Sequence, residues 1–207
     1  MPLAWTSPLI LPPGLTGRLR RAVAWALVAI GLFAGGVAAA ERIAITRAIL
    51  GPSAEADGGV VLDAQFDFEL PPVLEDAVNR GIALYFIIEF EMHRERWYWF
   101  DRKVAGETLS YRLTYSPLTR QYRLSRDTLA LPFDSLNEAL NSLRRVRGWR
   151  VFDQQLIAGG GDFRAQVRMR LDTSQLPRPF QINALTNRDW TLSSDWFNLR
   201  MPPEAAK

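Results

Sequence analysis

LYFIIEFEM, residues 84–92, is the stretch that decides the fold. Every second side chain in it is large and apolar, which places one set on a common face: Leu84, Phe86, Ile88, Phe90 and Met92. A period of two is the pattern of a β-strand that buries one face. The first half of the stretch is apolar on both faces, because Tyr85 and Ile87 occupy the other one. We therefore expect this strand to lie centrally in a β-sheet.

Two other long runs repeat this period with charges of opposite sign on their polar faces. Residues 60–70 alternate apolar side chains with mostly acidic ones, whereas residues 163–171 alternate them mostly with arginines. Shorter strands are expected over residues 43–50, 97–101, 111–115 and 121–125. The last two flank a connection that contains Pro117, and they therefore predict a hairpin.

One helix is predicted to begin after Ser135, because residues 135–138 match a capping box. An apolar stripe that extends to Val146 follows, and basic side chains that suit a helix C-terminus end it: Arg144, Arg145 and Arg147. A shorter helix is expected over residues 72–80, ended by Gly81. About seven strands with one or two short helices predict a mainly β domain, an antiparallel β-sandwich of immunoglobulin-like or C2-like kind.

The first forty residues carry the features of an export signal. Arginines at positions 18, 20 and 21 precede an uncharged stretch, residues 22–40, which ends in three alanines. A basic segment, an apolar segment and an A-x-A site are what the secretion machinery recognises. We expect residues 1–40 to be a signal peptide or a membrane anchor and residues 41–207 to form one domain outside the cytoplasm. The sequence leaves cleavage after Ala40 open.

The net charge and the cysteine and histidine content exclude or disfavour several classes of function. Residues 1–40 hold three of the 25 basic residues and no acidic one, so the remaining 22 basic residues equal the 22 acidic ones. A neutral domain gives no support to a nucleic-acid partner. The chain has no cysteine, which excludes thiol catalysis and cysteine-ligated metals, and His93 is its only histidine. We predict no catalytic residue, no metal site and no cofactor, and we do not expect an enzyme.

Arginine and tryptophan occur together in residues 94–102 and 188–196. Both residue types are enriched in interface hot spots, and an arginine stacks well on a tryptophan ring. If the protein has a binding surface, we expect the two segments to lie near each other and to supply it through Arg94, Arg96, Trp97, Trp99, Arg102, Arg188 and Trp190. The alternative is that the aromatic rings fill the core while the arginines pair with carboxylates on neighbouring strands.

Three separated motifs resemble the DUF4390 family of exported bacterial proteins of unknown function. They are residues 89–101 (EFEMHRERWYWFD), 118–124 (LTRQYRL) and 177–196 (PRPFQINALTNRDWTLSSDW). The resemblance implies a Gram-negative source and a place in the periplasm, or in the inner membrane facing the periplasm. It assigns no catalytic residue. Genes of the family often lie beside a sensor-kinase operon, which implies an accessory to a membrane sensor system.

Three function classes stay open. The first is a periplasmic binding or protein-interaction module whose partner is an unidentified envelope protein. The second is a carrier of a lipid or another apolar ligand, which needs a cavity between the sheets. The third is a hydrolase, which needs a polar cleft that joins the carboxylates of Asp63, Asp67, Glu89 or Glu91. The neutral charge and the lack of catalytic motifs favour the first class.

Overall fold

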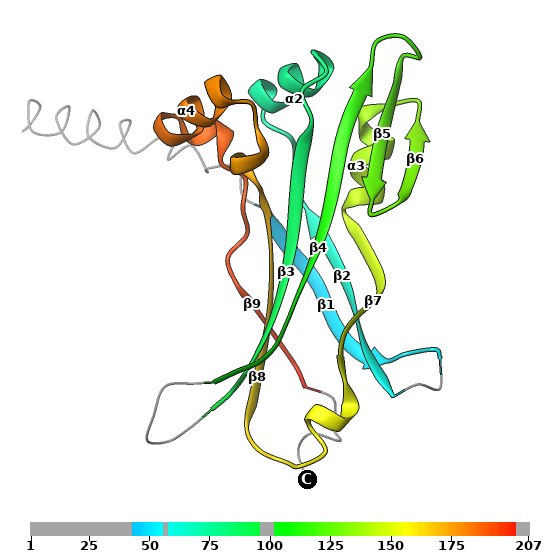
Figure 1. The fold of residues 1–207 in the computed structure, drawn as a ribbon, viewed down its shortest axis with the longest axis vertical. Coiled ribbons are helices and arrows are strands. Elements are labelled where there is room, and N and C mark those ends of the chain that lie inside the picture. The colour runs from blue at the N-terminus through cyan, green and yellow to red at the C-terminus, as the bar shows by residue number, and fades with distance from the viewer. Residues whose placement is uncertain (1–42, 56–57, 96–101, 202–207) are drawn as a thin grey trace, which may run out of the picture. The chain divides into compact units, whose positions relative to one another are not determined.

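Two antiparallel β-sheets pack face to face in the computed structural model, which describes residues 43–55, 58–95 and 102–201, apart from the side chains of Thr186 and Arg188 (Figure 1). The smaller sheet has the strand order β1-β2-β7, and the larger one has the order β6-β5-β4-β3-β8-β9. The strands are β1 (Ala44–Pro52), β2 (Gly59–Asp67), β3 (Leu84–Arg94), β4 (Arg102–Ser116), β5 (Gln121–Arg126), β6 (Leu129–Phe133), β7 (Arg145–Asp153), β8 (Phe163–Leu171) and β9 (Phe197–Leu199). The helices are α2 (Pro72–Asn79), α3 (Leu136–Leu143) and α4 (Arg178–Thr186), with short 3₁₀ turns η1 (Gln154–Leu156), η2 (Thr173–Gln175) and η3 (Arg188–Trp190). The predicted mainly β, antiparallel sandwich is confirmed.

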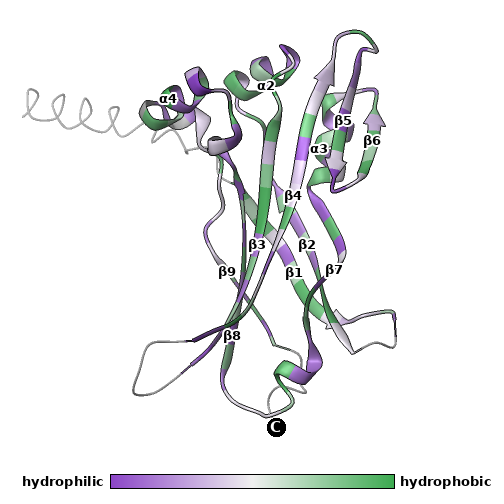
Figure 2. Ribbon diagram, in the orientation of Figure 1, coloured by the Kyte–Doolittle hydropathy of each residue, from purple (hydrophilic) through white to green (hydrophobic). Residues whose placement is uncertain are grey.

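Strand β3 lies centrally, as its sequence predicts. It pairs with β4 on one side and with β8 on the other, and its five alternate apolar side chains are 0% exposed. The ring of Phe90 stacks on that of Phe152 in β7, with 5.9 Å between the centroids. The buried face of β3 therefore meets the smaller sheet and forms the core with it. Figure 2 shows the corresponding alternation of hydrophobic and hydrophilic residues along β2 and β7.

The chain order explains which strands become neighbours. Strands β3 to β6 follow one another as a meander, and the chain then crosses through α3 to β7 in the smaller sheet. Strand β8 returns to the larger sheet on the free side of β3. The predicted hairpin of β4 and β5 is confirmed, and Arg120 in its turn has a positive φ of 54°. This order places the acidic outer side of β3 directly beside the basic outer side of β8.

The predicted start of α3 is confirmed, but its predicted end is wrong. The hydroxyl of Ser135 accepts a hydrogen bond of 3.2 Å from the backbone N–H of Glu138, as the capping box requires. The helix ends at Leu143, and Val146 belongs to β7, where it pairs with Ala64 of β2. Residues 145–153 therefore complete the smaller sheet by antiparallel pairing with β2. A local helical pattern contained no information on that distant partner.

Several elements differ from the sequence-based expectation. Helix α2 is confirmed, with Gly81 at a φ of 85° just after it. Strands β6, β7 and β9 and helix α4 were not predicted. The predicted strand over residues 97–101 and the predicted export segment, residues 1–40, lie outside the described residues. Within the described residues, no helix is long and apolar enough to span a membrane.

Candidate functional site

Each sheet of the sandwich has an outer face that carries the charged side chains. We call the outer face of the six-stranded sheet the large-sheet face and that of the three-stranded sheet the small-sheet face. The outward side chains of β8 are mostly arginine and those of β3 include Glu89 and Glu91, whereas the inward side chains of both strands are mostly buried and apolar. Any site built from the charged residues of these sheets therefore lies on one of two surfaces that the core separates.

The first predicted binding segment is described only at its two ends. Arg96, Trp97 and Trp99 lie outside the described residues. Arg102 is exposed at the start of β4. Arg94, at the end of β3, donates a hydrogen bond of 2.9 Å to the carbonyl oxygen of Gly160.

The guanidinium of Arg94 also lies over the ring of Phe163, 5.5 Å from its centroid. Both partners of Arg94 belong to the loop before β8 or to the start of that strand. Arg94 therefore holds this loop against the end of β3.

The second predicted segment needs a correction. Trp190 is only 5% exposed, and its ring packs on that of Phe180 in α4 with 5.2 Å between the centroids. Trp190 is therefore a core residue, because its large apolar ring fills the space between η3 and α4. Arg188 lies in η3, and its side chain is outside the described part of the structure.

The expectation that the two segments lie near each other is wrong for Arg94 and Trp190. Arg94 pairs with Phe163 at the first residue of β8, whereas η3 lies near the opposite end, where Leu171 bonds to Leu192. A strand of nine residues spans roughly 26 Å. The arginine and the tryptophan thus lie at opposite ends of β8.

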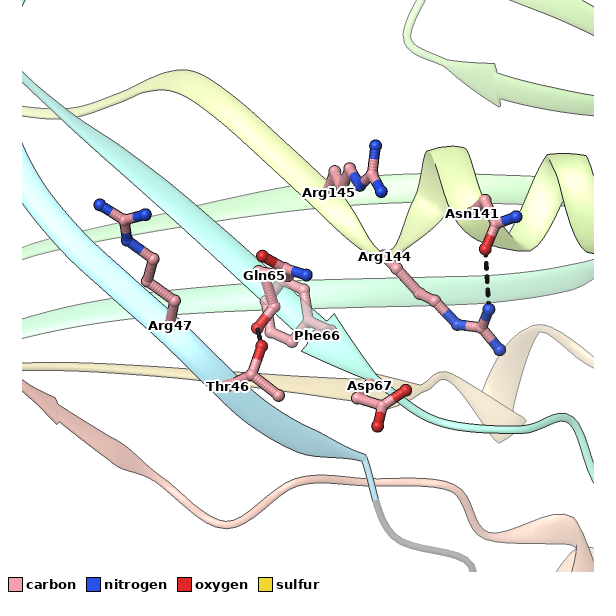
Figure 3. A pocket seen from close by; sticks show the side chains of 8 residues that line it. All are labelled: Thr46, Arg47, Gln65, Phe66, Asp67, Asn141, Arg144 and Arg145. Carbon is pink, nitrogen blue, oxygen red and sulfur yellow. Dashed lines mark hydrogen bonds between the residues drawn. The ribbon is translucent and has the colours of Figure 1, made fainter.

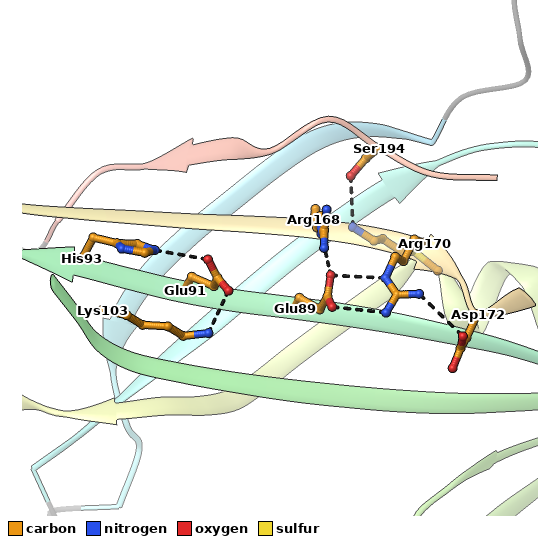
Figure 4. A network of polar contacts seen from close by, with 9 residues as sticks. Glu89, Glu91, His93, Lys103, Arg168, Arg170, Asp172 and Ser194 are labelled. Atoms are coloured by element: carbon orange, nitrogen blue, oxygen red, sulfur yellow. Dashed lines mark hydrogen bonds and ion pairs between the residues drawn. The ribbon is translucent and has the colours of Figure 1, made fainter. Parts of the chain in front are cut away.

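A cluster of paired charges occupies the middle of the large-sheet face (Figure 4). Glu89 of β3 pairs in register with Arg168 of β8, whose Nε lies 2.5 Å from Oε2 of Glu89. Nη2 of Arg170 lies 3.3 Å from Oε1 of the same carboxylate, and its Nη1 lies 3.6 Å from Oδ1 of Asp172. The guanidinium of Arg168 also lies over the ring of Trp196, 4.4 Å from its centroid. We call these five residues the Glu89 cluster.

The pKa of Glu89 shows what this cluster can do chemically. Partial burial alone would raise the pKa of the carboxyl group, but the hydrogen bonds and charges of Arg168 and Arg170 outweigh burial and hold the pKa below its ordinary value. Glu89 is therefore ionised at neutral pH, and both of its oxygens are occupied. Such a carboxylate is fitted to hold two arginines in place and not to transfer protons.

A second group of paired charges continues the same face. Nζ of Lys103 lies 2.7 Å from Oε1 of Glu91, and Nε2 of His93 lies 3.1 Å from Oε2 (Figure 4). The hydrogen bond from Lys103 lowers the pKa of Glu91, and partial burial opposes it only in part. Within the described residues, no group of three or more His, Asp or Glu side chains could hold a metal ion.

The four carboxylates considered for a hydrolase do not converge. Asp63 and Asp67 point outward from β2 on the small-sheet face, whereas Glu89 and Glu91 point outward from β3 on the large-sheet face. Fully buried side chains such as Leu62 and Phe86 fill the space between them. The described part of the structure therefore has no cleft that joins these four carboxylates, as the hydrolase class requires.

Two open grooves lie side by side on the small-sheet face. The first has a volume of about 580 Å³, and its lining is drawn in Figure 3. The second has a volume of about 540 Å³ and shares three residues with the first: Arg47, Gln65 and Arg145. Arg144 lines the first groove but is committed to the fold, since it donates to the carbonyl oxygen of Phe68 and, over 2.9 Å, to Asn141.

A family model matches most of the chain. Residues 40–200 match the model described as "Domain of unknown function (DUF4390)". The searches of curated proteins and of solved structures gave no significant match. The matched residues span the described sandwich and most of the chain. The chain therefore belongs to the DUF4390 family.

Proposed function

We propose that the protein is an exported protein-interaction module of the cell envelope and that the large-sheet face around the Glu89 cluster is its contact surface. The observation that carries the proposal is the stacking of the Trp196 ring on the guanidinium of Arg168, which an ion pair with Glu89 already holds in place. The family assignment itself supplies no activity. The proposed partner is an envelope protein, for which a membrane sensor system is the candidate that the family resemblance implies.

Two features of this face support the proposal: its residue types and the fixed conformation of its side chains. Tryptophan and arginine dominate interface hot spots, because they contribute a large contact area together with directed hydrogen bonds. The side chains of Glu89 and Arg168 are 20% and 35% exposed, so each is fixed by neighbours yet still reaches the surface. Side chains that are already fixed lose little conformational entropy when a partner binds.

Apolar and aromatic surface adjoins the cluster. Tyr85 and Ile87 are half-buried on the outward side of β3, and the guanidinium of Arg112 lies 5.9 Å from the centroid of the Tyr85 ring. An interface core typically combines aromatic side chains, arginine and apolar contacts in this way. The proposal therefore places the centre of the interface between β3 and β8.

The experiment uses a photo-crosslinking amino acid in place of Ser110, which is exposed and pairs with Ile87 across β3 and β4. Cells that produce the full-length chain should yield a discrete crosslinked product with an envelope protein. Adding Trp196→Ala should abolish the product, whereas the control Arg123→Ala, an exposed residue farther along the same sheet, should leave it intact. A product that survives Trp196→Ala, or that Arg123→Ala removes equally, would contradict the proposed surface.

Export needs its own test, because residues 1–40 carry that part of the proposal. A reporter that is active only outside the cytoplasm, fused after Lys207, should be active. Replacing Arg18, Arg20, Arg21 and the apolar segment with a polar sequence should eliminate that activity. Activity of a cytoplasm-specific reporter in the unaltered chain would contradict export.

A further inference from the structure

We infer that the small-sheet face binds an acidic protein segment through Arg47, Gln65, Arg145 and Arg147, which we call the arginine strip. This inference concerns a second surface and does not depend on the proposed contact at the Glu89 cluster. It rests on the register of three strands, on the lack of partners for three guanidinium groups and on the shape of the grooves around them.

The register aligns the first three residues of the strip. Arg47 of β1 pairs with Gln65 of β2, and Gln65 pairs with Arg145 of β7. Neighbouring strands lie about 4.8 Å apart, so the Cα atoms of the two arginines are about 10 Å apart with an amide side chain between them. Arg147 follows two residues farther along β7. The three arginines therefore start from an extended row of backbone positions, and Figure 3 shows the guanidinium groups of Arg47 and Arg145 apart from each other, on either side of Gln65.

None of these arginine side chains forms a hydrogen bond or an ion pair with the described part of the chain. Arg47, Arg145 and Arg147 are all exposed. Their side chains take up much of the lining of the second groove, together with Ile49, which is 46% exposed. A guanidinium group has five N–H donors and no acceptor, so a row of three presents many donors to whatever enters the groove.

The carboxylates of this face do not neutralise the strip. Asp63 accepts a hydrogen bond of 2.7 Å from the backbone N–H of Gly148, which stabilises the bulge of β7. Asp67 lies two residues beyond Gln65 on β2 and borders the first groove (Figure 3). In the described structure neither carboxylate forms an ion pair with an arginine of the strip. The positive charge of the row is thus available to an incoming group.

The spacing selects the class of partner. A single phosphate needs donors that converge within hydrogen-bond distance of one centre, whereas the guanidinium groups of Arg47 and Arg145 lie apart on either side of Gln65 (Figure 3). An extended peptide with an acidic residue at every second position presents carboxylates about 6.6 Å apart. This spacing matches that of Arg145 and Arg147, which are alternate residues of β7. The exposed side chain of Ile49 adds an apolar contact of the kind that a protein segment makes. An acidic, extended protein segment therefore fits the strip better than a single anion.

The test measures the binding of a fluorescein-labelled ten-residue peptide of alternating glutamate and threonine to the purified full-length chain. Fluorescence anisotropy should show binding that weakens as salt rises, because the Debye length shortens below about 10 Å above 0.1 M ionic strength. The double variant Arg47→Gln with Arg145→Gln should bind at least about tenfold more weakly. The same peptide with glutamine in place of glutamate should not bind.

The matched control is Arg123→Gln with Arg178→Gln, which removes the same charge from exposed sites elsewhere. It should change the affinity by less than about twofold, and Trp196→Ala should likewise have no effect. Equal weakening by the control would mean non-specific charge attraction and would overturn the inference. The inference would also be overturned if the unaltered chain did not bind the peptide. In that case, binding to phosphatidylglycerol vesicles or to inorganic phosphate that depends on Arg47 would show that the strip binds a different class of ligand.

Discussion

The two outer faces of the sandwich use arginine in opposite ways. On the large-sheet face Arg164, Arg168 and Arg170 each reach a carboxylate, at 2.6 Å, 2.5 Å and 3.3 Å. On the small-sheet face Arg47 and Arg145 flank Gln65 and reach none in the described part of the chain. The difference follows from register, since β8 lies beside acidic β3, whereas β1 and β7 flank a glutamine. The arginines of the first face therefore support the fold as well as the proposed contact, whereas Arg47 and Arg145 of the second face have no partner in the described part of the chain.

The largest expected effect is the difference in stability loss between a substitution on the inward side of β3 and one on its outward side. Phe86→Ala removes a side chain that is 0% exposed and should lower the free energy of unfolding by about 3–5 kcal/mol. Glu91→Ala, on the outward side of the same strand, should cost no more than about 1 kcal/mol because its ion pairs are partly solvated. Denaturant midpoints measure both values. Equal losses would mean that the register of β3 is wrong.

The next effect concerns the carboxylate that two arginines share. Glu89→Gln leaves Arg168 without its charged acceptor and Arg170 with Asp172 alone, and it should destabilise the protein by about 1–2 kcal/mol, a value reduced for the partial exposure of these side chains. Chemical denaturation of the full-length chain gives the value. A loss below the error of extrapolation would show that the pairing on this face is only a surface contact.

The same carboxylate predicts how stability depends on pH. The folded-state pKa of Glu89 lies below the ordinary value of 4.5, so the folded state binds fewer protons than the unfolded one in this window. The stabilisation is therefore complete above about pH 4.5 and is lost as pH falls through the lower folded-state value. The difference in thermal midpoint between the unaltered chain and Glu89→Gln should shrink as pH falls from 6 to 3. A difference that stays constant over this range would contradict the assignment.

A smaller effect is expected on the small-sheet face. Asp63→Ala removes the acceptor for the Gly148 N–H and should cost about 1 kcal/mol. It should not weaken binding of the acidic peptide to the arginine strip, because Asp63 forms no ion pair with the strip. Thermal denaturation and peptide titration of the same preparation measure the two quantities. Weaker peptide binding would show that Asp63 positions the strip.

The main strands could be predicted because a period of two is a local signal. Residues 84–92 and 163–171 show it clearly, and Ser135 and Glu138 show the capping box just as clearly. The end of α3 could not be predicted, because residues 145–153 become a strand through pairing with β2, which is distant in sequence. The three-residue strand β9 is too short to carry a pattern of its own.

The candidate sites were harder to predict than the fold. Within residues 188–196 the composition did not show which tryptophan is buried: Trp190 lies in the core, whereas Trp196 stacks on Arg168. The prediction for Arg96, Trp97 and Trp99 stays a prediction, because these residues lie outside the described part of the structure. The acidic side of one strand and the basic side of another were visible in the sequence, yet their contact depends on which strands become neighbours. The arginine strip spans three strands and is visible only when their register is known.

The most direct test compares two double variants that remove the same charge from the two faces. Arg168→Gln with Arg170→Gln should lower the free energy of unfolding by about 2–3 kcal/mol, because Glu89 loses both of its charged partners. Arg47→Gln with Arg145→Gln should change it by less than about 0.5 kcal/mol, because neither side chain holds a partner in the described structure. Equal losses from both pairs, or a larger loss from the second, would contradict the difference between arginines that support the fold through Glu89 and arginines that have no partner in the described chain.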